Sequence, residues 1–218
     1  MYVHILSLFP ESIVSYLESS MMKKAQEKGL FHYKIHNLTD WTVRHTRRVD
    51  DRPYGWGAGT ILTIEPLSHA IRDIVWKYGP MQILYPSPRG RTLDQRDMAS
   101  YAVSDRSYLL ICGHYEGIDA RIFDLFDIEE ISIGSYVLSS GELASLVWID
   151  SVVRLLPWVL SEASLEEESF SDALDRQIEY PQYSRPEIFE EQSVPKVLLS
   201  WDQKKIYLWK REHLWHTP

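Results

Sequence analysis

The sequence contains a single cysteine, Cys112, which excludes an intrachain disulfide framework and any zinc site built on cysteine. We interpret Cys112 as a small buried hydrophobe. No apolar run reaches the roughly 18 residues that suggest a membrane span. Residues 1–10 lack a basic region and a small-residue cleavage site, so they predict a first strand rather than a signal peptide. These absences favour a cytoplasmic protein that does not enter a membrane.

Motifs of several enzyme classes are missing as well. No segment matches the G-x-G-x-x-G fingerprint, the Walker A loop, H-E-x-x-H or G-x-S-x-G, and the eight histidines are scattered. The sequence therefore disfavours a phosphate-cradling loop and a nucleophilic serine, and we predict no metal-binding residues.

Basic residues are outnumbered by acidic ones, 23 to 31, and the net charge of −8 argues against a general nucleic-acid binder. The basic residues are unevenly placed, however. One cluster lies at residues 44–48, and a second lies near the carboxyl terminus at Lys204, Lys205, Lys210 and Arg211. Each cluster is consistent with a solvated surface or with an RNA contact.

Strand patterns alternate with helix patterns over the first 160 residues, which predicts a parallel sheet covered by helices. A helix begins near Ile13 and ends at Gly29. We expect loops at residues 50–59 and 86–90. The expected strands are residues 1–9, 31–37, 81–85, 108–111 and 130–133, and the other expected helices are residues 66–78 and 94–103.

Three glycine-containing loops, at residues 86–90, 113–117 and 134–141, follow expected strands. Ligands of open α/β sheets bind outside the carboxyl ends of the strands. A ligand without phosphate, held by backbone groups and flat side chains, fits such loops, and S-adenosylmethionine is one candidate. Its sulfonium is favoured near carboxylates and aromatic faces. Taken singly, each nearby side chain is equally consistent with a structural role: Tyr85, Tyr115, Glu116, Tyr136 and Glu142.

The composition changes after residue 160. Residues 161–175 are polar and acidic, and three prolines and an amphipathic segment at 204–214 follow. We predict a main domain at 1–160, a flexible acidic linker at 161–176 and a small helical domain at 177–218.

An ordered set of motifs resembles the bacterial tRNA (guanine-N1)-methyltransferase family over nearly the whole chain. The matching segments are ILSLFPE (5–11), VDDRPYG (49–55), CGHYEGID (112–119), EEISIGSYVLSSGEL (129–143), IDSVVRLLPWVL (149–160), ESF (168–170), PQYSRPEIFE (181–190) and VPKVLLS (194–200).

The resemblance implies the SPOUT fold, an α/β fold with a parallel sheet flanked by helices and a deep trefoil knot in the carboxyl part of the main domain. It implies a homodimer with active sites at the subunit interface, and a C-terminal domain that binds tRNA and is shortened here. The implied reaction moves a methyl group from S-adenosylmethionine to N1 of the guanine immediately 3′ of the anticodon. Magnesium is implied without a dedicated protein site.

The resemblance also carries residue roles. Arg154 and Glu168 are the implied catalytic residues, the first at the guanine and the second as general base. Asp50, Arg52 and Arg154 are the implied substrate-binding residues. The implied cofactor residues are Tyr85, Pro86, Ser87, Pro88, Gly113, Tyr115, Glu116, Ile133, Gly134, Ser135, Tyr136, Val137, Leu138 and Gly141.

Several residues depart from the family pattern, namely Trp56, Arg89, Ser135, Ser140 and Glu168. Glu168 replaces the usual aspartate and is longer by one methylene, about 1.5 Å. Two alternatives therefore stay open. One is a knotted cofactor- or RNA-binding protein with weakened or lost catalysis, and the other is a related knotted methyltransferase that acts on a different RNA guanine.

Overall fold

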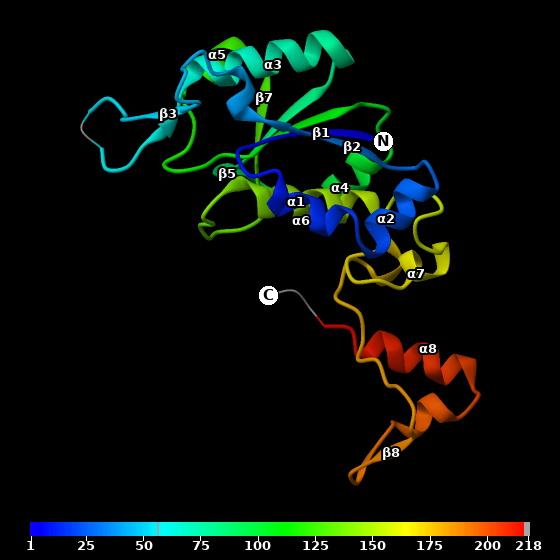
Figure 1. The fold of residues 1–218 in the computed structure, drawn as a ribbon. Helices are drawn as coiled ribbons and strands as arrows, with labels where there is room; N and C mark the ends of the chain where they lie inside the picture. Colours follow the sequence, from blue (N-terminus) through cyan, green and yellow to red (C-terminus); the bar gives the residue numbers. More distant parts are fainter. Residues whose placement is uncertain (56, 216–218) are drawn as a thin grey trace. The chain divides into compact units, whose positions relative to one another are not determined.

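The computed structural model describes residues 1–55 and 57–215. The chain divides into two compact units, Met1–Val159 and Leu160–Pro218 (Figure 1). No helix among the described residues is long and apolar enough to cross a membrane.

A five-stranded parallel sheet forms the centre of the first unit, with the strand order β2-β1-β6-β5-β7. The strands are β1 (Tyr2–Ser7), β2 (His32–Asn37), β5 (Gln82–Thr92), β6 (Tyr108–Ile111) and β7 (Ile128–Ser132). The parallel sheet expected from the alternating pattern is confirmed. Strand β6 is buried along its whole length, and its successive side chains pack alternately into the cores on the two faces of the sheet.

Helices cover both faces of this sheet (Figure 1). The core that contains Leu110 lies under α1 (Glu11–Leu17), α2 (Ser20–Glu27), α4 (Gln95–Ala102) and α6 (Gly141–Val153). The core that contains Leu109 and Ile111 lies under α3 (Ile64–Tyr78) and α5 (Ile122–Leu125), next to the 3-10 helix η1 (Leu38–Trp41).

Three local predictions need correction. The single helix expected from Ile13 to Gly29 is two helices, α1 and α2, and Ser20 at the start of the second has φ of +46°. Residues 86–90 are not a simple turn, because β5 continues through them with a bulge between Pro86 and Arg91 opposite β7. The loop expected at 50–59 begins with the strand β3 (Asp50–Asp51), which pairs with β4 (Ile61–Leu62).

The second unit holds α7 (Glu162–Glu166), the 3-10 helices η2 (Asp172–Leu174) and η3 (Lys196–Leu199), and α8 (Gln203–Glu212). It also holds a hairpin that was not expected, β8 (Ile188–Phe189) with β9 (Gln192–Ser193). Its two turn residues, Glu190 and Glu191, both have positive φ, a role in which Asn-Gly is the usual signal. The assignment of residues 161–176 as a flexible linker stays a prediction.

Two buried histidines on neighbouring strands form a titratable pair in the first unit. Nδ1 of His4 lies 2.9 Å from Nε2 of His36, and the ring of Tyr78 packs 4.5 Å from the ring of His4. Burial, followed by the charges of His4, Lys34 and Lys77, lowers the pKa of His36 to about 4, and burial also lowers the pKa of His4. The fold therefore holds His36 in its neutral form.

This pair predicts an acid-dependent loss of stability. The unfolded chain takes up a proton at His36 below about pH 6.5, whereas the folded chain resists protonation down to about pH 4. The free energy of unfolding should therefore be highest above pH 6.5, and it should fall by about 1–3 kcal/mol as the pH drops towards 4. Urea titrations at several pH values measure this fall. His36→Gln should show a shallower fall, and an identical slope in variant and wild type would contradict the assignment.

Candidate functional site

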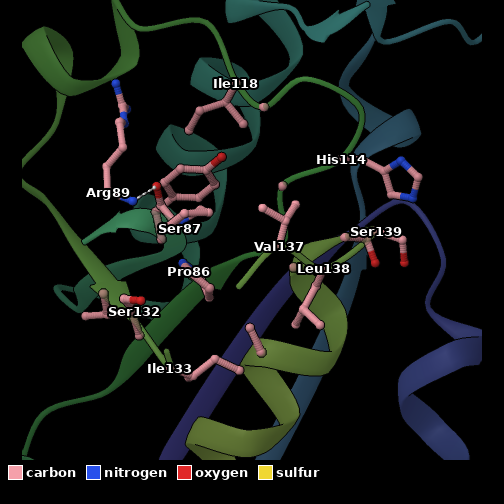
Figure 2. Close-up of a pocket in the computed structure, with 18 of the residues that line it drawn as sticks. Pro86, Ser87, Arg89, His114, Ile118, Ser132, Ile133, Val137, Leu138 and Ser139 are labelled. Atoms are coloured by element: carbon pink, nitrogen blue, oxygen red, sulfur yellow. Dashed lines mark hydrogen bonds between the residues drawn. The ribbon is translucent and has the colours of Figure 1, made fainter. Parts of the chain in front are cut away.

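A cavity of about 450 Å³ opens beside the bulge of β5 and at the carboxyl ends of β6 and β7. Three segments line it, namely the bulged part of β5 at residues 85–89 and the two stretches at 113–120 and 131–141 (Figure 2). Its size falls within the roughly 300–1,000 Å³ of small-molecule sites. The structure thus places a pocket where the sequence predicts one.

Every residue implied as cofactor-binding lines this cavity except Ser135, which is exposed and lies outside the lining. The residues brought together are Tyr85, Pro86, Ser87, Pro88, Gly113, Tyr115, Glu116, Ile133, Gly134, Tyr136, Val137, Leu138 and Gly141. Five further lining residues fall outside the three predicted loops and were missed by sequence reasoning, namely Ile118, Ala120, Ile131, Ser132 and Ala144. Their signal in the sequence was weak, because they lie before or after the glycines that marked the loops.

The loops after β6 and β7 are joined by their backbones. The N–H of Gly141 donates to the carbonyl of Gly113 at 2.8 Å, and His114 forms an antiparallel bridge with Ser140. A Cβ atom on Gly141 would lie 2.7 Å from the nitrogen of Gly113 and 2.8 Å from Cα of Cys112, closer than real Cβ contacts. This contact therefore requires glycine at position 141.

Gly113 presents bare backbone beside the ring of Tyr85. A Cβ atom at Gly113 would lie 2.7 Å from Oη of Tyr85, whose side chain is buried and whose pKa is raised by that burial. Ser87 accepts a hydrogen bond from the N–H of Arg89 (Figure 2) and so fixes the backbone of the bulge that follows Tyr85. A flat, mostly apolar ligand that hydrogen-bonds to main-chain groups fits these walls.

The charges around the cavity differ in their exposure. Arg89 is exposed and binds both oxygens of Glu130 at 3.2 Å, so this pair is internally neutral. Glu116 is exposed and lines the pocket. A cation bound in the cavity would therefore be attracted to the carboxylate of Glu116, whereas the carboxylate of Glu130 is already neutralised by Arg89.

Glu142, considered above as a ligand-facing carboxylate, does not line the cavity. It is 5% exposed, and its Oε1 accepts a hydrogen bond of 2.6 Å from Ser7 at the end of β1. Its Oε2 has no hydrogen-bond partner among the described residues. The side chain of Cys112 is 2% exposed, which confirms the prediction that it is a small buried hydrophobe. Burial also raises the pKa of its thiol. Glu142 thus ties α6 to β1 instead of facing the pocket.

The segment that holds Asp50 and Arg52 is attached to the loop at 113–117. The N–H of Glu116 donates to Thr60 at 3.0 Å, and the N–H of Leu62 donates to Gly117 at 2.9 Å. Asp50 pairs with Arg48 at 3.0 Å, which lowers the pKa of Asp50, and Arg52 is exposed. Trp56, one of the departures from the family pattern, lies outside the described residues.

The two implied catalytic residues lie in different units. Arg154 follows α6 directly, and its N–H donates to the carbonyl of Asp150 at 3.1 Å. Glu168 is half-buried and follows α7, and its carbonyl accepts a hydrogen bond of 3.1 Å from Ser171. Within residues 1–55 and 57–215, no group of three or more His, Cys, Asp or Glu side chains is arranged to hold a metal ion.

A family model and several known proteins match this chain over nearly its whole length. The model of the family described as tRNA (Guanine-1)-methyltransferase TrmD matches residues 1–217. A tRNA (guanine-N(1)-)-methyltransferase of Clostridioides difficile (strain 630) is 46% identical over 215 residues, which cover 97% of this chain and 91% of the relative. The corresponding protein of Carboxydothermus hydrogenoformans is 47% identical over 214 residues, covering 97% of this chain and 82% of the relative.

A solved structure is also similar. The crystal structure of tRNA (m1G37) methyltransferase from Aquifex aeolicus matches with a TM-score of 0.80 and 34% sequence identity, covering 98% of this chain and 88% of that one.

The tight contact at Gly141 generates a prediction. Gly141→Ala should lower the free energy of unfolding by about 1–3 kcal/mol, because the added methyl forces the backbones of the two loops apart. Urea unfolding measures the loss, and Ser139→Ala on the same loop serves as the control, with an expected change within about 0.5 kcal/mol. Equal stability of Gly141→Ala and wild type would show that the two loops separate without cost.

Proposed function

The chain belongs to the tRNA (guanine-1)-methyltransferase family, and we propose that it transfers a methyl group from S-adenosylmethionine to N1 of the guanine at tRNA position 37, immediately 3′ of the anticodon. The observation that carries this proposal is the family match over residues 1–217. The similarity to a tRNA (m1G37) methyltransferase of known structure supports the position of the target guanine.

S-adenosylmethionine is the methyl donor that suits the cavity. Bare backbone at Gly113 and the side chains of Ile133 and Leu138 offer an adenine both hydrogen-bonding groups and an apolar slot. The carboxylate of Glu116 and the aromatic ring of Tyr115 favour a sulfonium in the same cavity. No phosphate-binding loop is needed, and the sequence contains none.

The loops around the cofactor form a trefoil knot in this proposal. The family match supports it, and the contacts that such a knot would hold together are the backbone bond between Gly141 and Gly113 and the pairing of the β5 bulge with β7. Each brings chain segments far apart in sequence into direct backbone contact. Such a knot would hold the three loops in one geometry.

Arg154 and Glu168 perform the chemistry in this account. The guanidinium of Arg154 hydrogen-bonds to O6 of the guanine and stabilises the negative charge that develops there. The carboxylate of Glu168 takes the proton from N1. The N1 electron pair then forms a bond to the methyl carbon, the carbon–sulfur bond breaks, and the sulfonium becomes a neutral thioether. A divalent cation such as magnesium would act without a dedicated protein site.

A second copy of the chain completes the site. Four large apolar side chains are exposed on two adjacent helices, Val14 and Tyr16 on α1 and Leu143 and Val147 on α6. Exposed apolar surface of this kind marks interfaces. We place the homodimer contact here, with the active sites at the subunit interface.

The second unit contacts tRNA, and the protein works in the cytoplasm. Trp201, at 92% exposed, and Tyr207 lie in or beside α8 together with Lys204 and Lys205, which are also exposed. Exposed aromatic rings stack on unpaired bases, and lysines neutralise phosphates. Of the cluster near the carboxyl terminus, we therefore propose Lys204 and Lys205 as the RNA contact.

Methyl transfer with the purified protein tests the function. Labelled S-adenosylmethionine should methylate N1 of guanine in a tRNA that carries guanine at position 37, and should leave the same tRNA with adenine there unlabelled. Cofactor binding without transfer would instead favour a binding protein that has lost catalysis, and transfer to a different guanine would favour a related methyltransferase.

Glu168 gives the sharpest variant. Glu168→Gln should lower the single-turnover rate at least about 10²-fold with unchanged cofactor affinity, because it removes the base and keeps the shape. Glu168→Asp reports whether the extra methylene is a handicap, since a faster rate shows that it is. An undiminished rate in Glu168→Gln would exclude this residue as the base.

Arg154→Ala should lower the single-turnover rate by about 10²- to 10³-fold, because it removes the donor to the developing charge on O6. Arg154→Lys serves as its control, since a point charge restores part of the effect without the planar fork. Calorimetry should give the same cofactor affinity for all three proteins. A wild-type rate in Arg154→Ala would refute the role of this guanidinium.

A further inference from the structure

The segment that carries Glu168 is fastened to α8 by the neighbouring residue, Glu167. Oε2 of Glu167 accepts a hydrogen bond of 2.5 Å from Oη of Tyr180 and one of 2.6 Å from Nζ of Lys210. All three residues belong to the second unit. Glu167 thus joins the end of α7 to α8, although 43 residues separate Glu167 from Lys210 in the sequence.

This three-residue contact is more specific than an ordinary surface ion pair. Tyr180 is 5% exposed, and Nζ of Lys210 also lies 4.7 Å from the centre of its ring. The hydrogen bond from Lys210 lowers the pKa of Glu167, with a further contribution from Tyr180, so the carboxylate stays ionised. Charge-assisted hydrogen bonds from two partners to one oxygen fix its position, whereas a lone exposed pair contributes little.

The backbone around Glu168 is fixed on its other side as well. Ser171 donates from its N–H to the carbonyl of Glu168 at 3.1 Å and from its hydroxyl to the carbonyl of Glu166 at 2.8 Å. The N–H of Phe170 donates to Gln177 at 2.8 Å. Since one peptide bond links Glu167 to Glu168, restraint of the first side chain restrains the backbone of the second.

We propose that Glu167 is a positioning residue that sets the place of the general base, Glu168, by anchoring its segment to Lys210 and Tyr180. This inference rests on the proposed role of Glu168. In this proposal α8 contacts tRNA and also holds the segment that bears Glu168. Binding of α8 to tRNA therefore brings the Glu168 carboxylate to N1 at the same time. The anchor at Glu167 also restricts the positions that the carboxylate of Glu168 can reach, although its side chain is longer than aspartate.

The same segment offers a matched control. Arg211 forms an ion pair with Asp175 and donates to the carbonyl of Ala173 at 3.1 Å. This pair also links α8 to the residues after α7, but it lies beyond η2 and is not adjacent to Glu168. Asp175→Asn therefore removes a comparable ion pair without touching the neighbour of the base.

The test is a charge swap read by single-turnover methyl transfer at saturating tRNA and S-adenosylmethionine. Glu167→Ala, Glu167→Lys and Lys210→Glu should each lower the rate by about three- to tenfold, and Glu167→Gln by less, because it keeps an acceptor oxygen. The double variant Glu167→Lys with Lys210→Glu should recover to within about twofold of wild type, as should Asp175→Asn. Cofactor affinity should be unchanged throughout.

Affinity for tRNA, measured separately by filter binding, distinguishes positioning from RNA contact. Lys210→Glu can weaken tRNA binding through its charge, but the rate at saturation should still recover in the double variant. Unchanged rates in Glu167→Ala and Lys210→Glu, or a change in tRNA affinity alone, would overturn the positioning role and leave the proposed function standing. Absence of methyl transfer in the wild-type protein would overturn both.

Discussion

The hydrogen bond from the N–H of Gly141 to the carbonyl of Gly113 is the contact on which the site depends. It holds the loop after β6 against the loop after β7, and both loops line the cavity. The backbones approach so closely at Gly141 that an added Cβ atom would collide with Gly113 and Cys112, whereas a Cβ atom at Gly113 would meet the ring of Tyr85. The cavity therefore has walls of main-chain groups beside the buried ring of Tyr85. A ligand recognised by its shape and its hydrogen-bonding edge suits such a pocket better than one recognised by charge.

Charge is used elsewhere in the molecule. The basic residues at 44–48 are held in three ion pairs within the first unit: Arg44–Asp51, Arg47–Asp40 and Arg48–Asp50. In the second unit, Lys210 is paired with Glu167, the neighbour of Glu168, and Arg211 is paired with Asp175. An acidic protein can thus act on RNA with few uncommitted cations, and part of its basic surface organises the chain that supplies the base. Binding and chemistry are linked through α8 in this account.

Much of the first unit could be predicted from the sequence, because its strands carry local patterns. The strand at Tyr108–Ile111 and the loops after the central strands follow directly from apolar runs that end at glycines. The β5 bulge could not be foreseen, since it depends on pairing with β7, far along the chain. The hairpin at Glu190 and Glu191 lacks the usual turn residues. The roles of Arg154 and Glu168 came from resemblance alone, because neither residue stands in a pattern that indicates chemistry. The anchoring of Glu167 is visible only when α8 is in place.

The central claim is that the cavity between the two joined loops holds S-adenosylmethionine. A calorimetric titration of this cofactor into the wild-type protein and into Gly113→Val tests it most directly. A valine side chain would meet the ring of Tyr85 and fill the wall against which the adenine is placed. The account predicts saturable binding to the wild type and loss of binding in a folded Gly113→Val protein. Equal affinity of the two proteins for S-adenosylmethionine would contradict it.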